Sequence, residues 1–231
     1  MTDEVRTTFH RELDALRTEL VELAARAGEL VARATEALLD GDAAATALLA
    51  ADDELAEVQS QRIEQRCFRL LALQNPVAAD LRTLAAGMRI NSELLRAGEL
   101  ATSIARRAEQ LAGVELPPRL RGLIAAMSEH AVWMLRIATD AFVERDAPLG
   151  AALDDIDNHL DDLQRSFMAA MFEAHDQHAL GLAHSVQLAL VARFFERIGD
   201  HAVNIGERVV FMASGTAPEH PGAGRILQRS P

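Results

Sequence analysis

The sequence contains no lysine and no tyrosine, and only one cysteine and one tryptophan occur in its 231 residues. Aromatic residues make up 4% of the chain, whereas strands favour aromatic and β-branched side chains. The single cysteine, Cys67, excludes an internal disulfide, and its apolar neighbours predict a small buried residue. Alanine, leucine, glutamate and arginine are abundant, and these residues favour helices. The composition therefore predicts an all-α protein.

Basic residues are outnumbered by acidic ones: the chain contains 23 basic and 35 acidic residues, and its net charge is −12. No stretch concentrates arginine, so we do not expect binding to nucleic acid, whose phosphates repel such a chain. The first residues contain no basic segment followed by an apolar run, and His184, Gln187 and Arg193 interrupt the most apolar stretch, 179–195. We therefore expect a cytoplasmic protein without direct membrane insertion.

Sparse glycine- and proline-containing breaks divide the chain into segments with apolar residues at helical spacing. The break before the last segment contains neither residue, and we place it within 173–178. Residues 214–231 are rich in glycine, proline and serine and are expected to form a disordered tail. The expected helices span residues 4–40, 43–74, 77–112, 117–145, 148–176 and 178–213.

The two halves of the chain repeat one another. Residues 34–37, Ala-Thr-Glu-Ala, match residues 138–141, Ala-Thr-Asp-Ala, and collinear matches follow. Each half is therefore predicted to be a three-helix bundle, 1–113 and 117–213, so that six long antiparallel helices form two pseudo-symmetric units. The aligned pairs include Asp42 and Asp146, Asp53 and Asp157, and Glu57 and Asp161 at an offset of 104, and Arg96 and Arg197, Gly98 and Gly199, and Glu99 and Asp200 at an offset of 101.

Carboxylates spaced four residues apart share a helix face. In the second half these pairs are Asp157/Asp161 and Glu196/Asp200, and the latter pair continues into Asn204 on a polar line outside the apolar stripe. An acidic helix face in water is the simplest interpretation. Like charges at this spacing repel, however, and a cation bridging two helices would remove the repulsion. Oxygen ligands suit Mg, Ca, Mn or Fe, whereas Zn prefers His or Cys.

The first half offers a weaker version of the same pattern. Asp53 and Glu57 are present, and Glu99 corresponds to an acid of the second half. Leu95 stands where the repeat places the counterpart of Glu196. A metal site in the first half would therefore lack one carboxylate.

Several other residues can be interpreted as either structural or functional. We interpret His201 as a polar surface residue rather than a ligand, and Trp133 as a core residue. Asp80 and Arg82 are either a helix-start charge and a surface base or contacts to a partner. A Walker-type phosphate loop, which needs lysine, a His-Glu-x-x-His motif and a Gly-x-Ser-x-Gly elbow are all missing. No enzymatic activity is therefore predicted.

Two motifs carry a family resemblance. Residues 195–205, Phe-Glu-Arg-Ile-Gly-Asp-His-Ala-Val-Asn-Ile, resemble the signature of the PhoU family of phosphate-uptake regulators. Residues 75–82, Asn-Pro-Val-Ala-Ala-Asp-Leu-Arg, resemble the motif that opens the third helix in that family. The resemblance runs from about residue 8 to residue 212.

The resemblance implies two symmetry-related three-helix bundles whose acidic pairs hold metal, with Fe, Mg, Mn or Zn as candidates. It also implies a negative regulator of phosphate-starvation signalling, peripheral at the inner face of the membrane. Its implied partners are the ATPase subunit of a phosphate-specific ABC transporter, a sensor histidine kinase and a second copy of the chain. The matching metal positions are Asp157, Asp161, Glu196, Asp200, Asp53, Glu57 and Glu99, and the candidate partner contacts are Asp80, Arg82, Arg197 and Asn204.

Two other functions remain open at this point. The first is a carboxylate-bridged metal enzyme or metal-storage bundle. No glutamate is followed three residues later by histidine, so the ligand pattern of ferritin-like di-iron proteins is missing. The second is a helical interaction protein whose acidic faces bind nothing.

Overall fold

The computed structural model describes residues 2–42, 44–74, 76 and 78–215, and these residues form helices and no strand. The all-α prediction is therefore confirmed. The helices are α1 (Thr2–Asp40), α2 (Ala45–Gln74), α3 (Ala79–Ala105), the short α4 (Arg107–Gln110), α5 (Pro118–Glu144), α6 (Ala147–Asp176) and α7 (Leu182–Ser214).

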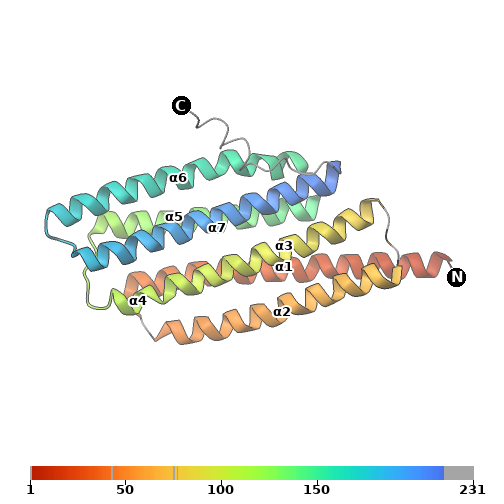
Figure 1. Cartoon of the computed structure of the whole chain (residues 1–231), viewed down its shortest axis with the longest axis horizontal. Helices are drawn as coiled ribbons and strands as arrows, with labels where there is room; N and C mark the ends of the chain where they lie inside the picture. Colours follow the sequence, from red (N-terminus) through yellow and green to blue (C-terminus); the bar gives the residue numbers. More distant parts are fainter. Residues whose placement is uncertain (1, 43, 75, 77, 216–231) are drawn as a thin grey trace, which may run out of the picture.

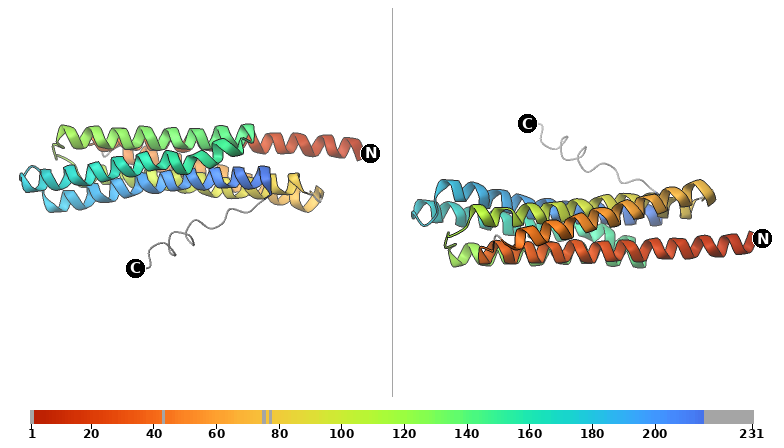
Figure 2. Two further views of the ribbon diagram at one scale, coloured as in Figure 1. Left: turned by 90° about the horizontal axis from the view of Figure 1, so that it is seen from above. Right: turned by 90° about the horizontal axis from the view of Figure 1, so that it is seen from below.

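The long helices form two antiparallel three-helix bundles that lie side by side along their length (Figure 1). One bundle contains α1, α2 and α3, and the other contains α5, α6 and α7. The bundles meet through two helix pairs, α3 with α7 and α1 with α5, while α2 and α6 lie on the outside. Figure 2 shows the resulting elongated shape, with α1 extending past the other helices at one end. The predicted pair of pseudo-symmetric bundles is confirmed.

The largest differences between predicted and observed helix boundaries lie at the end of the third helix and the start of the last one. The third helix ends at Ala105 rather than near residue 112, and α4 follows as a separate turn. The last helix starts at Leu182 rather than 178, because the amides of Ala179 and Leu180 both donate to the Ala174 carbonyl and close α6. Ser214 still belongs to α7, and the rest of the predicted tail, from residue 216, lies outside the described residues.

An aspartate caps the second helix of each bundle. The Asp42 carboxylate accepts hydrogen bonds from the amides of Ala44 and Ala45 at 3.0 and 3.2 Å. The Asp146 carboxylate accepts one from the Leu149 amide at 2.9 Å. Asp42 and Asp146 are repeat equivalents, and such caps satisfy amide groups that have no partner within a helix. The duplication therefore extends to the local interactions that start a helix.

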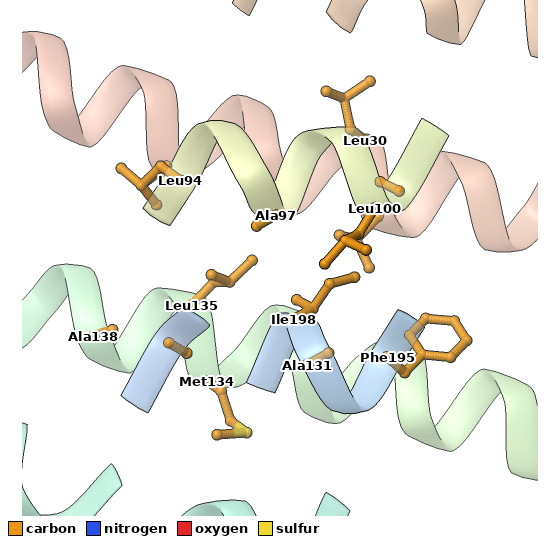
Figure 3. Packing of buried hydrophobic residues seen from close by; sticks show 14 of the residues in the cluster. Leu30, Leu94, Ala97, Leu100, Ala131, Met134, Leu135, Ala138, Phe195 and Ile198 are labelled. Atoms are coloured by element: carbon orange, nitrogen blue, oxygen red, sulfur yellow. The ribbon is translucent and has the colours of Figure 1, made fainter. Parts of the chain in front are cut away.

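The core is continuous across both bundles. Figure 3 shows buried apolar side chains of α3 beside those of α5 and α7, and all of them belong to one hydrophobic cluster. Burial of this apolar surface is the main stabilising contribution, at about 25 cal/mol per Å² removed from water. The labelled residues are Leu30, Leu94, Ala97, Leu100, Ala131, Met134, Leu135, Ala138, Phe195 and Ile198.

Of the two single residues that the sequence assigns to the interior, one is buried and the other is exposed. Cys67 is fully buried as predicted, and burial, followed by the charges of Glu19 and Glu64, raises the pKa of its thiol to about 12. Trp133 is 44% exposed, so its assignment to the core is wrong. The centre of its ring lies 5.2 Å from that of His130, with the two ring planes tilted by 49°, outside the buried stripe of α5. Among the described residues, no helix combines the length and apolar character needed to cross a membrane.

The second and third helices of the second bundle approach closely. Cβ atoms added at Gly150 or Gly206 would meet the backbone of the facing helix, the former lying 2.8 Å from the Gly206 carbonyl oxygen. At the equivalent crossing of the first bundle, the Thr46 hydroxyl donates to the Ala105 carbonyl at 3.2 Å. Gly150 and Gly206, which have no side chains, therefore let the backbones of α6 and α7 come close together at this crossing.

Candidate functional site

The candidate site lies where α6 packs against α7. Asp157 is subject to the charges of Asp161, Glu196 and Asp200, so the four acids predicted for this half lie in one region of the α6–α7 contact. Asp157 is half-buried, and its Oδ1 atom is buried without a hydrogen-bond partner. A buried carboxylate oxygen of this kind is costly unless a proton, a donor or a cation compensates it.

Gly199 makes room for the Asp157 carboxylate. A Cβ atom at position 199 would lie 2.5 Å from Asp157 Oδ1 and 2.6 Å from Leu160 Cδ2. Only glycine therefore permits the aspartate of α6 to lie against the backbone of α7. This contact explains the glycine within the 195–205 motif in physical terms.

Burial, together with the crowding of like charges, raises two pKa values at the site. Burial, followed by the charges of Asp161 and Asp200, raises the pKa of Asp157 to about 7. Burial and Glu196 also raise the pKa of Asp200, although Arg193 opposes this shift. Near neutral pH the site therefore favours uptake of a positive charge, either a proton or a metal cation.

The carboxylate oxygens of the site are ligands that suit a hard cation, but they do not point toward a single common position. Glu196 Oε2 accepts a hydrogen bond from Gln164 Nε2 at 2.6 Å, and Glu196 Oε1 is paired with Arg193. Within the described part of the chain, no three His, Cys, Asp or Glu side chains are grouped as metal ligands. Metal binding would therefore require side-chain rotation, and the predicted metal role of these residues stays a prediction.

The first bundle places Asp53 at the equivalent position. Its Oδ1 atom is likewise buried without a hydrogen-bond partner, and it lies 3.4 Å from a Cβ atom built at Gly98. Burial raises the pKa of Asp53, while Thr102 and Arg106 oppose this shift. Glu57 and Glu99 are exposed, and half-buried Leu95 contributes no ligand.

A polar cluster not predicted from the sequence joins the two bundles. His201 Nδ1 lies 2.7 Å from Glu93 Oε2, which also accepts a hydrogen bond from Asn204 Nδ2 at 3.1 Å. His201 is 8% exposed, so its assignment to the surface is wrong. Its position, three residues after Ile198 and four before Ile205, was the available signal, because this spacing places it on the buried stripe of α7.

We expect the Glu93→Gln variant to have a free energy of unfolding about 1–3 kcal/mol lower than that of the parent chain, because it removes the charge from the half-buried hydrogen bonds that Glu93 makes between the bundles. His201 and Asn204 hold the pKa of Glu93 below its ordinary value despite the opposing effect of burial. Urea unfolding at neutral pH measures the effect. The Ser92→Ala change on the exposed side of α3 should remain within about 0.5 kcal/mol of the parent chain. Equal stability of the two variants would show that the cluster contributes nothing.

The candidate partner contacts lie in different places. Asp80 lies in the first turn of α3, as the helix-start reading predicts, and Arg82 Nε donates to the Met212 carbonyl at 3.3 Å. Arg197 is exposed on α7, whereas Asn204 faces α3 through its bond to Glu93. Their roles in binding a partner stay predictions.

The fold and the site together define a class of protein: a duplicated helical scaffold with a half-buried aspartate against a helical glycine in each half. A model of the PhoU domain matches residues 20–108 and 124–209. The chain therefore belongs to the PhoU domain family.

Known relatives cover nearly the whole chain. A phosphate-specific transport system accessory protein PhoU homolog 1 of Mycobacterium tuberculosis is 36% identical over 215 residues, which is 93% of this chain and 96% of the relative. The crystal structure of PhoU from Pseudomonas aeruginosa has a TM-score of 0.82 at 28% identity, covering 90% of this chain and all of that one. The phosphate transport system regulatory protein PhoU from Streptococcus pneumoniae has a TM-score of 0.84 at 25% identity, covering 91% and 99%.

Proposed function

We propose that this chain is an accessory, regulatory protein of phosphate uptake. It would act as a negative regulator that links a phosphate-specific ABC transporter to a sensor histidine kinase. Membership of the PhoU domain family, with a match in both halves of the chain, is the observation that carries this proposal. Relatives covering 93% of the chain are accessory proteins of phosphate-specific transport systems. The role proposed is binding rather than catalysis, at the inner face of the membrane and as a homodimer.

The acidic site of the second bundle would control this binding through its charge. Asp157, Asp161, Glu196 and Asp200 would hold a divalent or trivalent cation such as Fe, Mg, Mn or Zn. The bound ion would supply positive charge and fix the relative positions of α6 and α7. Asp157 supports the proposal, because it combines a buried, unpartnered oxygen with a raised pKa. Gln164 and Arg193 hold Glu196 in place through its two carboxylate oxygens.

We expect the double variant Glu196→Ala and Asp200→Ala to lose metal and to bind its partners about tenfold more weakly, with little loss of helicity. The tagged chain would be used in pull-downs from phosphate-replete cells, followed by measurement of the transporter ATPase and the kinase. Asp155→Asn is a matched control, because Asp155 is an exposed acid of the same bundle.

Three measurements would contradict the proposal. The first is recovery of neither partner with the parent chain. The second is undiminished recovery with the double variant, which would separate partner binding from the acidic site. The third is redox turnover by the metal-loaded chain, which would favour a carboxylate-bridged metal enzyme instead. Collapse of helicity, measured by circular dichroism, would assign the two acids a structural role.

A further inference from the structure

An open apolar groove lies along the contact between α1 and α5. Its volume is about 410 Å³, and apolar residues form most of its lining. Between Val21 and Ala32, the first and last of these residues on α1, the helix advances about 17 Å, which is about three turns. Val21 and Ala25 are exposed, so the groove is open to solvent. It therefore has the length and the apolar character that would receive one face of a short helix.

The packing of α1 against α5 does not account for Gly28, one of the lining residues. A Cβ atom built there would make an ordinary contact, 3.7 Å, with Val132 Cγ1. Alanine would therefore fit within the chain, although glycine inside a helix costs up to about 1 kcal/mol relative to alanine. Ala25 and Ala32 also line the α1 side of the groove. Small side chains at this surface let the backbone of a third helix approach closely.

Two further exposed apolar residues border the groove on α5. Trp133 follows Val132, which lines the groove, and its side chain is 44% exposed. It is the only tryptophan in the chain, and tryptophan is enriched among the residues that contribute most to binding at interfaces. Val143 is 42% exposed and follows the lining residue Thr139 by four positions, so it extends the apolar surface on the same side of α5.

Acidic residues outnumber basic ones along the rim of the groove. The exposed lining residues include two acids, Glu29 on α1 and Asp140 on α5, and one base, Arg136. Glu36 follows Glu29 by seven residues, and it lies exposed on the same side of α1. Glu129 precedes Arg136 by seven residues, and it lies exposed on the same side of α5. A partner with basic residues beside its apolar contacts would therefore complement this rim.

We propose that the α1–α5 groove binds an amphipathic helix of a protein partner, whose apolar face fills the groove and whose flanking basic residues meet the acidic rim. A second copy of the chain complements the groove poorly, because its own helices would bring the same acids to the rim and each copy has a net charge of −12. The proposed homodimer would therefore use another surface. The inference rests on the proposed binding role and adds to it a surface and the chemistry of the partner.

The single tryptophan provides a direct test. The probe is a synthetic peptide of about 18 residues without tryptophan, with leucine at positions i, i+3, i+4 and i+7 and lysine on both flanks of this face. On titration into the full chain, we expect the fluorescence of Trp133 to shift to shorter wavelength and to saturate, because the helix shields its ring from water. A peptide of the same composition in scrambled order should bind at least tenfold more weakly, and so should a peptide with glutamate in place of lysine.

Two variants of the chain locate the binding. Ala25→Phe fills the groove from an exposed position, and we expect at least tenfold weaker binding of the peptide. Glu29→Arg reverses one charge at the rim, and it should weaken binding about threefold, as an exposed charge pair would. Ala51→Phe, at an exposed position of α2, is the matched control and should bind as the parent chain does. Circular dichroism establishes that each variant is folded, and Glu29→Arg tests the site even where Ala25→Phe fails to fold.

Several results would overturn the inference. Binding of the scrambled peptide as tight as that of the amphipathic one, or undiminished binding to Ala25→Phe and Glu29→Arg, would show that the groove is not the site. Sedimentation in which a dimer of the parent chain is dissociated by Ala25→Phe, but not by Ala51→Phe, would make a second copy the occupant. A parent chain that recovers the transporter ATPase and the kinase but binds no peptide would overturn the inference and leave the proposed function intact. Peptide binding by a chain that recovers neither partner would support the groove and contradict the proposed function.

Discussion

Alanine in place of Gly206 is expected to lower the free energy of unfolding by about 3 kcal/mol, because it overpacks a backbone contact between two helices. The added Cβ atom would overlap the Gly150 carbonyl oxygen and lie 2.7 Å from Leu153 Cδ1. Backbone atoms cannot rotate aside as a side chain can, so α7 would have to move away from α6. Urea unfolding followed by circular dichroism measures the change.

Gly122→Ala is the matched control for this prediction. Gly122 lies within α5, and no heavy atom lies within 4 Å of a Cβ atom built there. Alanine should raise the free energy of unfolding by about 0.5–1 kcal/mol, because it restricts the unfolded chain and favours the helix. Comparable effects of the two substitutions would mean that the α6–α7 contact is less close than the structure shows.

We expect the Asp157→Asn variant to be more stable than the parent chain at pH 8 in the absence of metal, by about 2 kcal/mol. The pKa of Asp157 is about 7 in the folded chain, against an ordinary value of 3.8. Three pKa units correspond to about 4 kcal/mol, and we halve this figure because the carboxyl group is partly exposed and screened. Asparagine keeps the shape of the side chain but carries no charge.

The sign of this effect follows from proton linkage. Between pH 4 and pH 7 the folded chain holds a proton on Asp157 that the unfolded chain has released. The contribution of Asp157 to stability is therefore complete below about pH 4 and lost as the pH rises through 7. Thermal unfolding from pH 4 to pH 8 should show this loss in the parent chain and a flatter profile in Asp157→Asn. Parallel profiles would contradict the raised pKa.

A divalent cation should reverse the order of stability, so that the parent chain becomes more stable than the Asp157→Asn variant. Binding to the folded chain stabilises it by about 2.7 kcal/mol when the free ion is at a hundred times its Kd. The parent chain at pH 8 should gain this stability on addition of Mn²⁺, and Asp157→Asn should not. The Asp155→Asn variant, altered at an exposed acid of the same helix, should respond as the parent chain does.

The sequence was sufficient for features that depend on periodicity and local interactions. Apolar spacing predicted the long helices, and the two offsets predicted the duplicated bundle before any coordinates. Cys67 was assigned to the interior from its neighbours, and it is fully buried. The break before α7 was misplaced, because its closure depends on backbone bonds to Ala174 rather than on a glycine or proline within 173–178.

What the sequence by itself determined is therefore the long helices, their number in each repeat and the helix faces that carry the acids, because these follow from residue spacing along one chain. Only the tertiary structure decided which acids matter electrostatically. Asp157 and Asp161 lie four residues apart on one helix, yet it is Asp157 that lies against Gly199 of another helix, where burial raises its pKa to about 7. His201 was likewise misassigned because its partner, Glu93, lies 108 residues away, across the contact between the bundles. Burial and the summed field of neighbouring charges depend on distances between helices, which no pattern within a single helix contains.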